Sequence, residues 1–137
     1  MSRRDAILAT LAAIPYAQML GVRPEFEDGQ FRLVLPYKAS NIGNPALPAL
    51  HGGALGGFLE LCAITQLALS MERDGQPKPI GISVDYLRRG RPEDTFATAR
   101  IARLGSRVAN VRVEAWQSDP ESPIATLHGN FLLPPKG

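Results

Sequence analysis

The order of apolar and polar residues along this 137-residue chain predicts a short leading helix, one long central helix and about six strands. Within residues 4–14, Ile7, Leu8 and Leu11 recur at helical spacing and form one apolar stripe. Pro15 ends this pattern, because proline lacks the N–H that a helix interior needs. We expect the leading helix to pack as a cover on the rest of the domain.

Alternation of apolar and polar residues with a period of two marks the strands. Asp28-Gly29, a dipeptide favoured in tight hairpin turns, separates the first two strands, and Pro24 suits an edge strand. Residues 38–50 are predicted as a loop, because asparagine, glycine and proline interrupt any regular pattern there. The predicted strands cover residues 21–27, 30–37, 79–89, 94–102, 106–117 and 122–133. The short connections between the last four strands favour an antiparallel meander.

The central helix is apolar on every side, since Leu55, Phe58, Leu61 and Ile64 cannot share one stripe. Polar residues interrupt this stretch, and it is shorter than the ~20 residues of a membrane span, so we interpret it as a buried core helix. An antiparallel sheet curled around the helix would enclose it, with a second copy of the chain covering what remains open. The expected fold class is therefore α+β.

Composition is that of an ordinary soluble domain, with 45% hydrophobic residues, 20% charged residues and a formal net charge of +2. We expect residues 1–137 to form one domain, with no nucleic-acid partner and no membrane partner. Cys62 is the single cysteine, which leaves no internal disulfide and no paired cysteines for zinc. An export signal is not expected, because Asp5 interrupts the N-terminal pattern of charge and apolar residues. With a single cysteine, a reducing, cytoplasmic setting is the default expectation.

The main candidate chemistry lies in His51-Gly52-Gly53, at the start of the central helix, and in Glu60 further along it. Glycines at a helix start leave backbone N–H groups accessible, and such groups can bind an oxyanion. A lone carboxylate among apolar residues is costly, which favours its use as a base or nucleophile over a structural ion pair. These are the two parts of an acyl-transfer site. No GxSxG elbow is present, so a serine hydrolase of the α/β type is unsupported.

The segments HGGALGGFLE at residues 51–60 and GISVDYLRRGR at residues 81–91, with the order of elements, resemble the hotdog-fold acyl-CoA thioesterases of the phenylacetate-degradation (PaaI-like) type. The resemblance covers residues 16–133 and implies the hotdog fold, an antiparallel sheet wrapped around one central helix. In that family the histidine and two glycines start the helix, and an acid follows nine positions later. This chain has Glu60 there, in place of the more usual aspartate.

The resemblance implies hydrolysis of an acyl- or aryl-CoA thioester to the free acid and coenzyme A. It assigns Glu60 as general base or nucleophile, and the backbone N–H of Gly52, helped by Gly53, as the oxyanion donor. We expect no metal and no cofactor other than the coenzyme A of the substrate.

Other positions match supporting residues of the family. His51 is expected to help place the thioester and the nucleophile. The loop asparagine of the family is matched by Asn44, with Asn41 as the alternative. Ser83 matches a serine that assists the acid in some relatives. Its strand alternation turns it away from the central helix if its two neighbours face that helix.

Helix geometry places Gly52 and Glu60 in two different sites. At ~1.5 Å per residue, the eight residues between them span ~12 Å of one helix. An oxyanion donor and a base must both lie within ~3 Å of the reacting groups. We therefore expect an obligate homodimer, in which antiparallel central helices bring Gly52 of one subunit to Glu60 of the other. Whether two such dimers form a homotetramer is left open.

Coenzyme A carries phosphates, which suit the forked donors of arginine. Candidate phosphate ligands lie near predicted strand ends and turns, at Arg88, Arg89, Arg91, Arg103 and Arg107. The alternative for each arginine is an ordinary solvated turn charge.

Two other functions remain open on the sequence alone. One is a non-catalytic acyl-CoA-binding or regulatory protein of the same fold. The other is a hotdog hydratase or dehydratase, although the proline-rich histidine loop of those enzymes is absent. Cys62 is expected to be a small core residue, and His128 to be structural or exposed.

Overall fold

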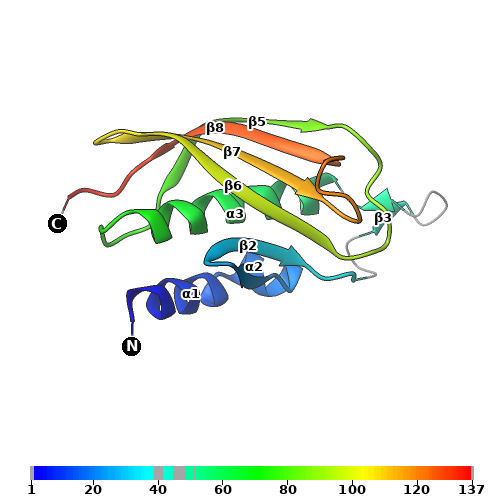
Figure 1. Ribbon diagram of the computed structural model, residues 1–137, viewed down its shortest axis with the longest axis horizontal. Helices are drawn as coiled ribbons and strands as arrows, with labels where there is room; N and C mark the ends of the chain where they lie inside the picture. The colour runs from blue at the N-terminus through cyan, green and yellow to red at the C-terminus, as the bar shows by residue number, and fades with distance from the viewer. Residues whose placement is uncertain (1, 39–41, 45–48, 51, 137) are drawn as a thin grey trace.

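The computed structural model describes residues 2–38, 42–44, 49, 50 and 52–136. In Figure 1 a sheet forms the upper layer, one long helix lies under it, and two short helices lie below that helix. The elements in chain order are α1 (Arg3–Ala13), α2 (Pro15–Leu20), β1 (Arg23–Glu27), β2 (Gln30–Leu35), β3 (Ile42–Asn44), β4 (Ala49–Leu50), α3 (Gly52–Ser70), β5 (Lys78–Tyr86), β6 (Thr95–Leu104), β7 (Val108–Trp116) and β8 (Ala125–Leu132).

The main sheet has six antiparallel strands in the order β1-β2-β6-β7-β8-β5. A long helix packed on one face of such a sheet is the hotdog arrangement, so the expected fold class is confirmed. The predicted meander is correct for β6, β7 and β8 but wrong for β5, which pairs with β8 instead of β6. The physical reason is that β2 already occupies the free edge of β6.

The hydrophobic core lies between α3 and the inner face of the sheet. Residues of β7 and β8 alternate between buried and solvent-facing positions, as expected for a sheet covered on one side. Burying a leucine or phenylalanine side chain stabilises the fold by roughly 1.5–3 kcal/mol. The fully enclosed side chains of this core include Phe58, Leu59, Cys62, Val111, Val113, Leu127 and Phe131.

Two short helices cover the other side of α3, where the sequence pattern predicted one. The Ser2 hydroxyl accepts a hydrogen bond from the Asp5 N–H and caps α1. Pro15 ends α1 as predicted, but it also takes the first position of α2, where a missing N–H costs nothing. Gly21 then ends α2 in the left-handed conformation, with φ of 75°.

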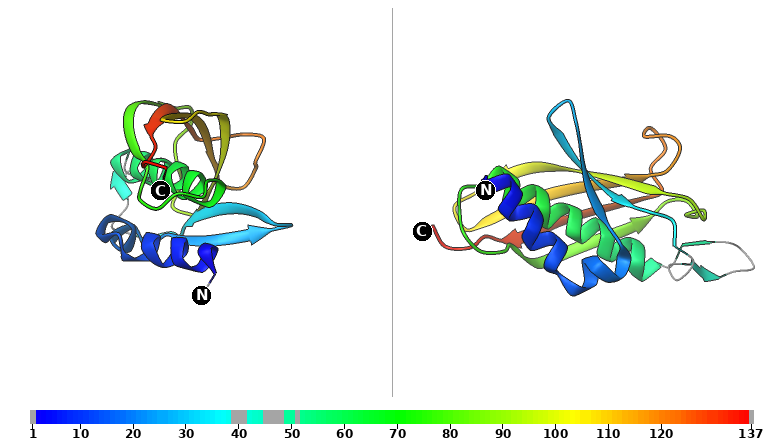
Figure 2. Two further views of the ribbon diagram at one scale, coloured as in Figure 1. Left: turned by 90° about the vertical axis from the view of Figure 1, so that its left-hand side faces the viewer. Right: turned by 90° about the horizontal axis from the view of Figure 1, so that it is seen from below.

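The Asp28-Gly29 turn is confirmed, and both of its residues have positive φ, 52° and 79°. β2 pairs with β6 only through Leu33–Leu35, so the tip of the β1–β2 hairpin stands away from the sheet, as Figure 2 shows. Residues 38–50, predicted as a loop, contain the short antiparallel pair β3–β4. β3 has three residues and β4 has two, so neither strand is long enough for an alternation of apolar and polar residues to be recognised in the sequence.

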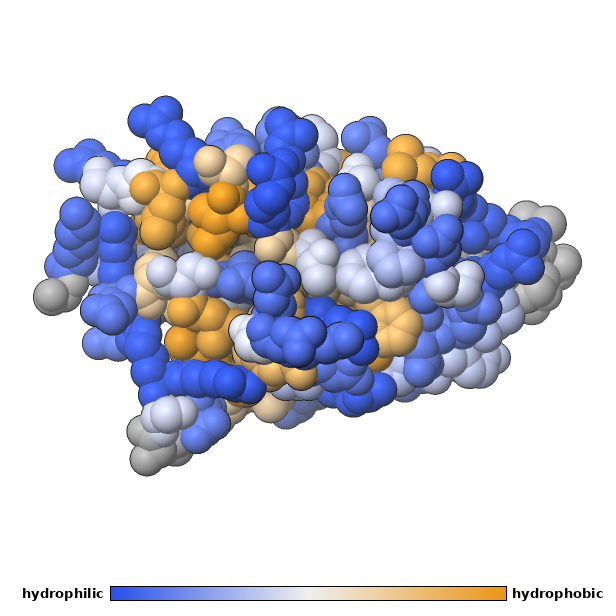
Figure 3. All heavy atoms as spheres, viewed as in Figure 1, coloured by the Kyte–Doolittle hydropathy of each residue, from blue (hydrophilic) through white to orange (hydrophobic). Residues whose placement is uncertain are grey.

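The helix α3 is 19 residues long with a mean hydropathy of 1.4, which by length and composition alone would suit a membrane span. Core helices of soluble proteins have the same character, and 56% of this stretch is buried inside the fold. Figure 3 shows charged and polar side chains over most of one face of the molecule, with apolar patches between them.

Candidate functional site

The exposed first turn of α3 contains the predicted oxyanion donor. Gly52 and Gly53 are its first two residues, as predicted, and both are solvent-exposed. The first N–H groups of a helix have no intrahelical acceptor and carry the positive end of the helix dipole. His51 and Asn41 lie outside the described residues. The backbone of Asn44 belongs to β3, and its side chain also lies outside what the structure describes.

Glu60 lies on the same continuous helix, eight residues after Gly52, and its side chain is half-buried. Within residues 2–38 and 52–136, no lysine or arginine forms an ion pair with this carboxylate. The described part of the chain therefore gives no support to a structural ion pair. The exposed N–H groups at the start of α3 and the Glu60 carboxylate therefore lie ~12 Å apart along the helix axis.

Two tyrosines that the sequence reasoning missed contact the start of α3. The Tyr86 hydroxyl, from the end of β5, donates a hydrogen bond to the Gly52 carbonyl at 2.9 Å. The Tyr16 hydroxyl, from α2, donates to the Gly53 carbonyl at 3.0 Å. These contacts join residues 34 and 37 positions apart in the sequence. The sequence signal that could have found them is the run of small residues at the start of α3, because such residues let other groups pack closely.

Gly56 and Gly57 are explained by the same two tyrosines. A Cβ on Gly57 would lie 2.7 Å from Cζ of Tyr16, and a Cβ on Gly56 would lie 3.2 Å from the Tyr86 hydroxyl oxygen. Glycines within a helix permit other groups to pack closely against it. In the structure they make room for two aromatic side chains of the same chain.

The Tyr16 hydroxyl stays protonated well beyond neutral pH. Partial burial raises its pKa, and the negative charge of Glu60 and the neighbouring Tyr86 raise it further. Tyr16 therefore remains a hydrogen-bond donor at neutral pH. The effect of Glu60 also shows that the carboxylate lies within electrostatic range of this hydroxyl.

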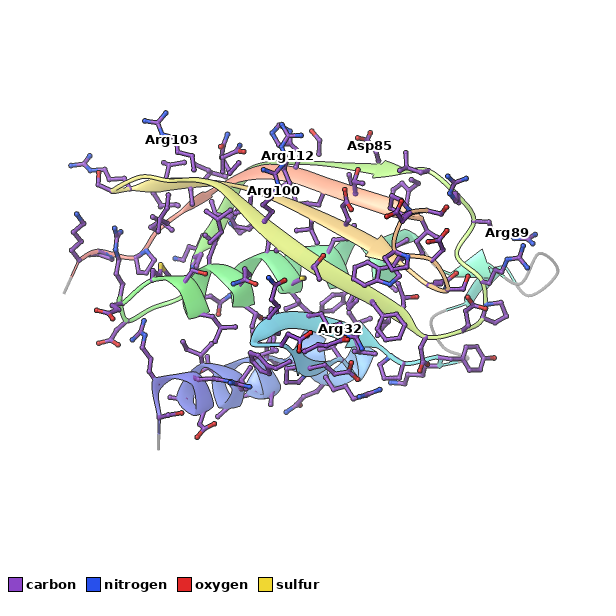
Figure 4. The ribbon with its side chains drawn as sticks, in the orientation of Figure 1. Arg32, Asp85, Arg89, Arg100, Arg103 and Arg112 are labelled. Carbon is purple, nitrogen blue, oxygen red and sulfur yellow. The ribbon has the colours of Figure 1, made fainter. Side chains whose placement is uncertain are left out.

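Ser83 lies on the outer face of the sheet, away from α3. It is exposed and pairs in register with His128 of β8, which is also exposed. Its neighbour Val84 packs against the core, so the expected alternation is confirmed. Figure 4 shows Asp85, two residues after Ser83, pointing away from α3 on that outer face. The structure therefore does not bring Ser83 to Glu60 of the same chain.

The predicted arginines divide into two groups. Arg88, Arg89 and Arg91 line one surface cavity of about 480 Å³, together with Gln117, Asp119 and Ser122. Arg107 does not line this cavity, because it follows β6 in the turn before β7. Arg103, near the end of β6, lies at the opposite end of the molecule from Arg89, as Figure 4 shows.

A buried amide fixes the loop that carries these arginines. The Gln117 side chain is 9% exposed. It accepts from the Arg91 N–H at 3.0 Å and donates to the Arg91 carbonyl at 2.9 Å and the Thr95 hydroxyl at 3.1 Å. Because both ends of the amide are used, the loop has one preferred conformation. The lining of the cavity thus has three arginines against one aspartate, and Gln117 fixes the backbone at Arg91.

Cys62 is fully buried in α3, as expected for a small core residue. Burial raises the pKa of its thiol to about 12, so it is protonated and is not a nucleophile at neutral pH. Among the described residues, no group of three or more histidine, cysteine, aspartate or glutamate side chains could hold a metal ion.

A comparison with known families identifies the chain. The family model for the acyl-CoA thioesterase N-terminal domain matches residues 44–132, which include Gly52 and Glu60 and make up more than half of the chain. The chain belongs to the acyl-CoA thioesterases. This thioesterase is accordingly a thioester hydrolase of the hotdog superfamily.

Similar proteins cover almost all of this thioesterase. It is 30% identical over 134 residues to the medium/long-chain acyl-CoA thioesterase YigI of Escherichia coli, covering 88% of this chain and 86% of that one. A crystal structure from Chromobacterium violaceum is 40% identical, covers 96% of this chain and 91% of its own, and superposes with a TM-score of 0.76. A phenylacetic acid degradation-related protein of Ralstonia eutropha is 21% identical and shares the fold, with a TM-score of 0.80 and coverage of 96% and 100%.

Proposed function

We propose that this thioesterase hydrolyses an acyl-CoA thioester to the free acid and coenzyme A at a site shared by two copies of the chain. The observation that carries the proposal is the layout of α3, which begins at Gly52 and holds Glu60 eight residues later without an ion pair in the described chain. These groups are ~12 Å apart along one helix. A base and an oxyanion donor must both approach one reacting carbonyl to ~3 Å. Gly52 of one copy therefore works with Glu60 of the partner subunit.

In the reaction, water adds to the thioester carbonyl carbon and passes a proton to Glu60. The carbonyl oxygen becomes negative and is stabilised by the Gly52 N–H, a donor of a kind worth ~10²–10³ in rate. Collapse of the tetrahedral intermediate breaks the C–S bond, and the coenzyme A thiolate leaves and takes up the proton. Direct attack by Glu60, giving an anhydride that water then hydrolyses, is the alternative route. We assign His51 and Asn44 the role of placing the thioester.

The strand β5 offers the surface on which two copies meet. It is the outer strand beside β8, so one edge of its backbone has no partner among the described strands. Ile80, Ile82 and Tyr86 of β5 expose 56%, 38% and 56% of their surface. An edge strand with exposed apolar side chains pairs readily with another chain. A two-fold axis beside β5 sets the two α3 helices antiparallel, which the shared site requires.

The coenzyme A phosphates are assigned to the cavity lined by Arg88, Arg89 and Arg91. Its lining has three arginines and one acidic residue, Asp119, and none of the three arginines forms an ion pair with a described residue. Forked donors of this kind bind phosphate oxygens with defined geometry.

Replacing Arg89 by glutamine is expected to raise KM for acyl-CoA about five- to tenfold with kcat unchanged, because one partly exposed charge-assisted contact is lost. Steady-state kinetics at two salt concentrations measures this, and the parent should lose affinity with salt more steeply than the variant. The matched control is Arg100→Gln on the outer face of the sheet, outside this cavity. Equal effects of the two substitutions would remove the cavity from the proposal.

The acyl group is proposed to be a medium or long aliphatic chain, a substrate class supported by the name of the Escherichia coli relative. Thiol release from butanoyl-, octanoyl-, palmitoyl- and phenylacetyl-CoA tests this assignment. We expect the octanoyl or palmitoyl ester to give the highest kcat/KM. A maximum with the phenylacetyl ester would overturn the chain assignment. Release at the background rate from all four esters would overturn the proposed function.

A further inference from the structure

The start of α3 is an intrinsically weak piece of helix. Gly52, Gly53, Gly56 and Gly57 are four of its first six residues. Glycine in a helix interior costs about 0.8–1 kcal/mol relative to alanine, because more backbone freedom is lost. A turn with this composition needs contacts from outside the helix to stay in one conformation. This turn is also the one that carries the N–H assigned to the oxyanion.

Tyr16 and Tyr86 supply those contacts from two sides. Their hydroxyls donate to the carbonyls of Gly53 and Gly52, at 3.0 Å and 2.9 Å. Their side chains occupy the space that a Cβ on Gly57 or Gly56 would need. The glycines and the tyrosines therefore form one arrangement, since alanine at Gly57 would displace the ring of Tyr16. The free energy of helix formation lost through the glycines is offset by the tyrosine contacts that the glycines allow.

We propose that Tyr16 and Tyr86 are positioning residues of the thioester site, which hold the first turn of α3 so that the Gly52 N–H keeps its direction toward the reacting oxygen. This inference rests on the proposed function, because it concerns the same oxyanion donor. Neither tyrosine is assigned a proton-transfer step. Each is hydrogen-bonded to a carbonyl that follows the Gly52 N–H along the chain, and it acts on that N–H by fixing the backbone of Gly52 and Gly53.

The hydroxyl groups of Tyr16 and Tyr86 are the part of these side chains that positions the turn. A carbonyl that accepts a second hydrogen bond is fixed in direction, and hydrogen-bonded peptide groups polarise one another in series. Tyr16 stays protonated, so it donates at every pH of interest. Tyr86 also belongs to β5, the strand at which two copies are proposed to meet, so pairing at that edge holds Tyr86 in place. The oxyanion turn is thereby tied to the subunit contact.

Tyr16→Phe and Tyr86→Phe test the proposal, because they remove the hydroxyls and keep the rings. We expect each to lower kcat about five- to tenfold, the fold-change of one ordinary hydrogen bond, while KM stays within about twofold. The matched control is Tyr37→Phe, a third tyrosine that is 50% exposed. Among the described residues its hydroxyl has no hydrogen bond, and the substitution should leave both constants unchanged.

A second, independent variant moves a tyrosine without altering it. Gly57→Ala places a Cβ against the Tyr16 ring while making α3 intrinsically more helical. We expect a loss of kcat similar to that of Tyr16→Phe in a protein of undiminished helix content. Amide hydrogen exchange provides a readout apart from activity. In both tyrosine variants, exchange should accelerate at Gly56 and Gly57, whose N–H groups pair with the Gly52 and Gly53 carbonyls along the helix, and stay unchanged in residues 61–70.

The possible results distinguish a failure of the positioning role from a failure of the proposed function. A parent enzyme that turns over acyl-CoA while Tyr16→Phe and Tyr86→Phe match it in kcat and in exchange would overturn the positioning role and leave the proposed function intact. Losses confined to KM would also overturn it, because they would make the tyrosines substrate-binding groups. A parent without turnover would overturn the proposed function, and this inference with it.

Discussion

Replacing Glu60 by glutamine is expected to lower kcat at least ~100-fold, the lower end of the contribution of a positioned general base. Glutamine has nearly the same size and shape as glutamate, but it neither accepts a proton from water nor attacks a thioester carbonyl. KM should change little, because the substrate is held mainly through coenzyme A and the acyl chain. Steady-state thiol release measures both constants.

Two further variants make this result specific. Glu114→Gln alters an exposed glutamate on β7 and should keep full activity. Glu60→Asp keeps the carboxylate that relatives more often carry, and it should retain part of the activity. If Glu60→Gln turns over as fast as the parent enzyme, Glu60 is not the base or the nucleophile.

The second large effect is expected from Gly52→Pro, which removes the proposed oxyanion donor from a position where proline fits a helix. We expect kcat to fall ~10²–10³-fold, the usual cost of losing one such N–H. Gly52→Ala is the matched control. It keeps the N–H, and its Cβ would make only an ordinary contact, 3.7 Å from Tyr86. Full activity of the proline variant would exclude Gly52 as the donor.

Mixing the two inactive proteins tests whether the site is shared. In a dimer of one Glu60→Gln chain and one Gly52→Pro chain, one site carries both defects and the other carries neither. After unfolding and refolding an equal mixture, half of the dimers are of this kind, and about one quarter of the parent activity should return. Sites built within single chains would give no recovery. Gel filtration of the parent should show a dimer or a larger assembly, and an active monomer would contradict the distance argument.

Local sequence signals predicted much of the fold. The Asp28-Gly29 turn, the start of the central helix at Gly52 and the strand segments depend on neighbouring residues, and these were correct. The position of β5 was wrong, because strand order depends on which edges are already occupied, and alternation carries no information about that. The second short helix was missed because Pro15 reads as an end of one helix and also suits the start of another.

The part of the candidate site that lies on one helix was also predicted from local sequence spacing. Gly52 and Glu60 belong to one helix, so the number of residues between them converts directly into a distance along its axis. Tyr16 and Tyr86 could not be found in this way, since they come from elements on either side of α3 and meet it only in three dimensions. The cavity lined by Arg88, Arg89 and Arg91 likewise depends on Gln117, which follows β7.

The burial of Cys62 has a practical consequence for the activity measurements. Turnover is followed by the free thiol of coenzyme A, and the enzyme carries one thiol of its own. Because that thiol is fully enclosed and its pKa is about 12, we expect the folded protein not to react with the chromogenic disulfide that detects the product. Unfolding exposes it, at one equivalent per chain. With substrate present, the reagent therefore measures the coenzyme A that is released. Without substrate, it measures the fraction of unfolded enzyme, so an unfolded variant is recognised without a separate probe.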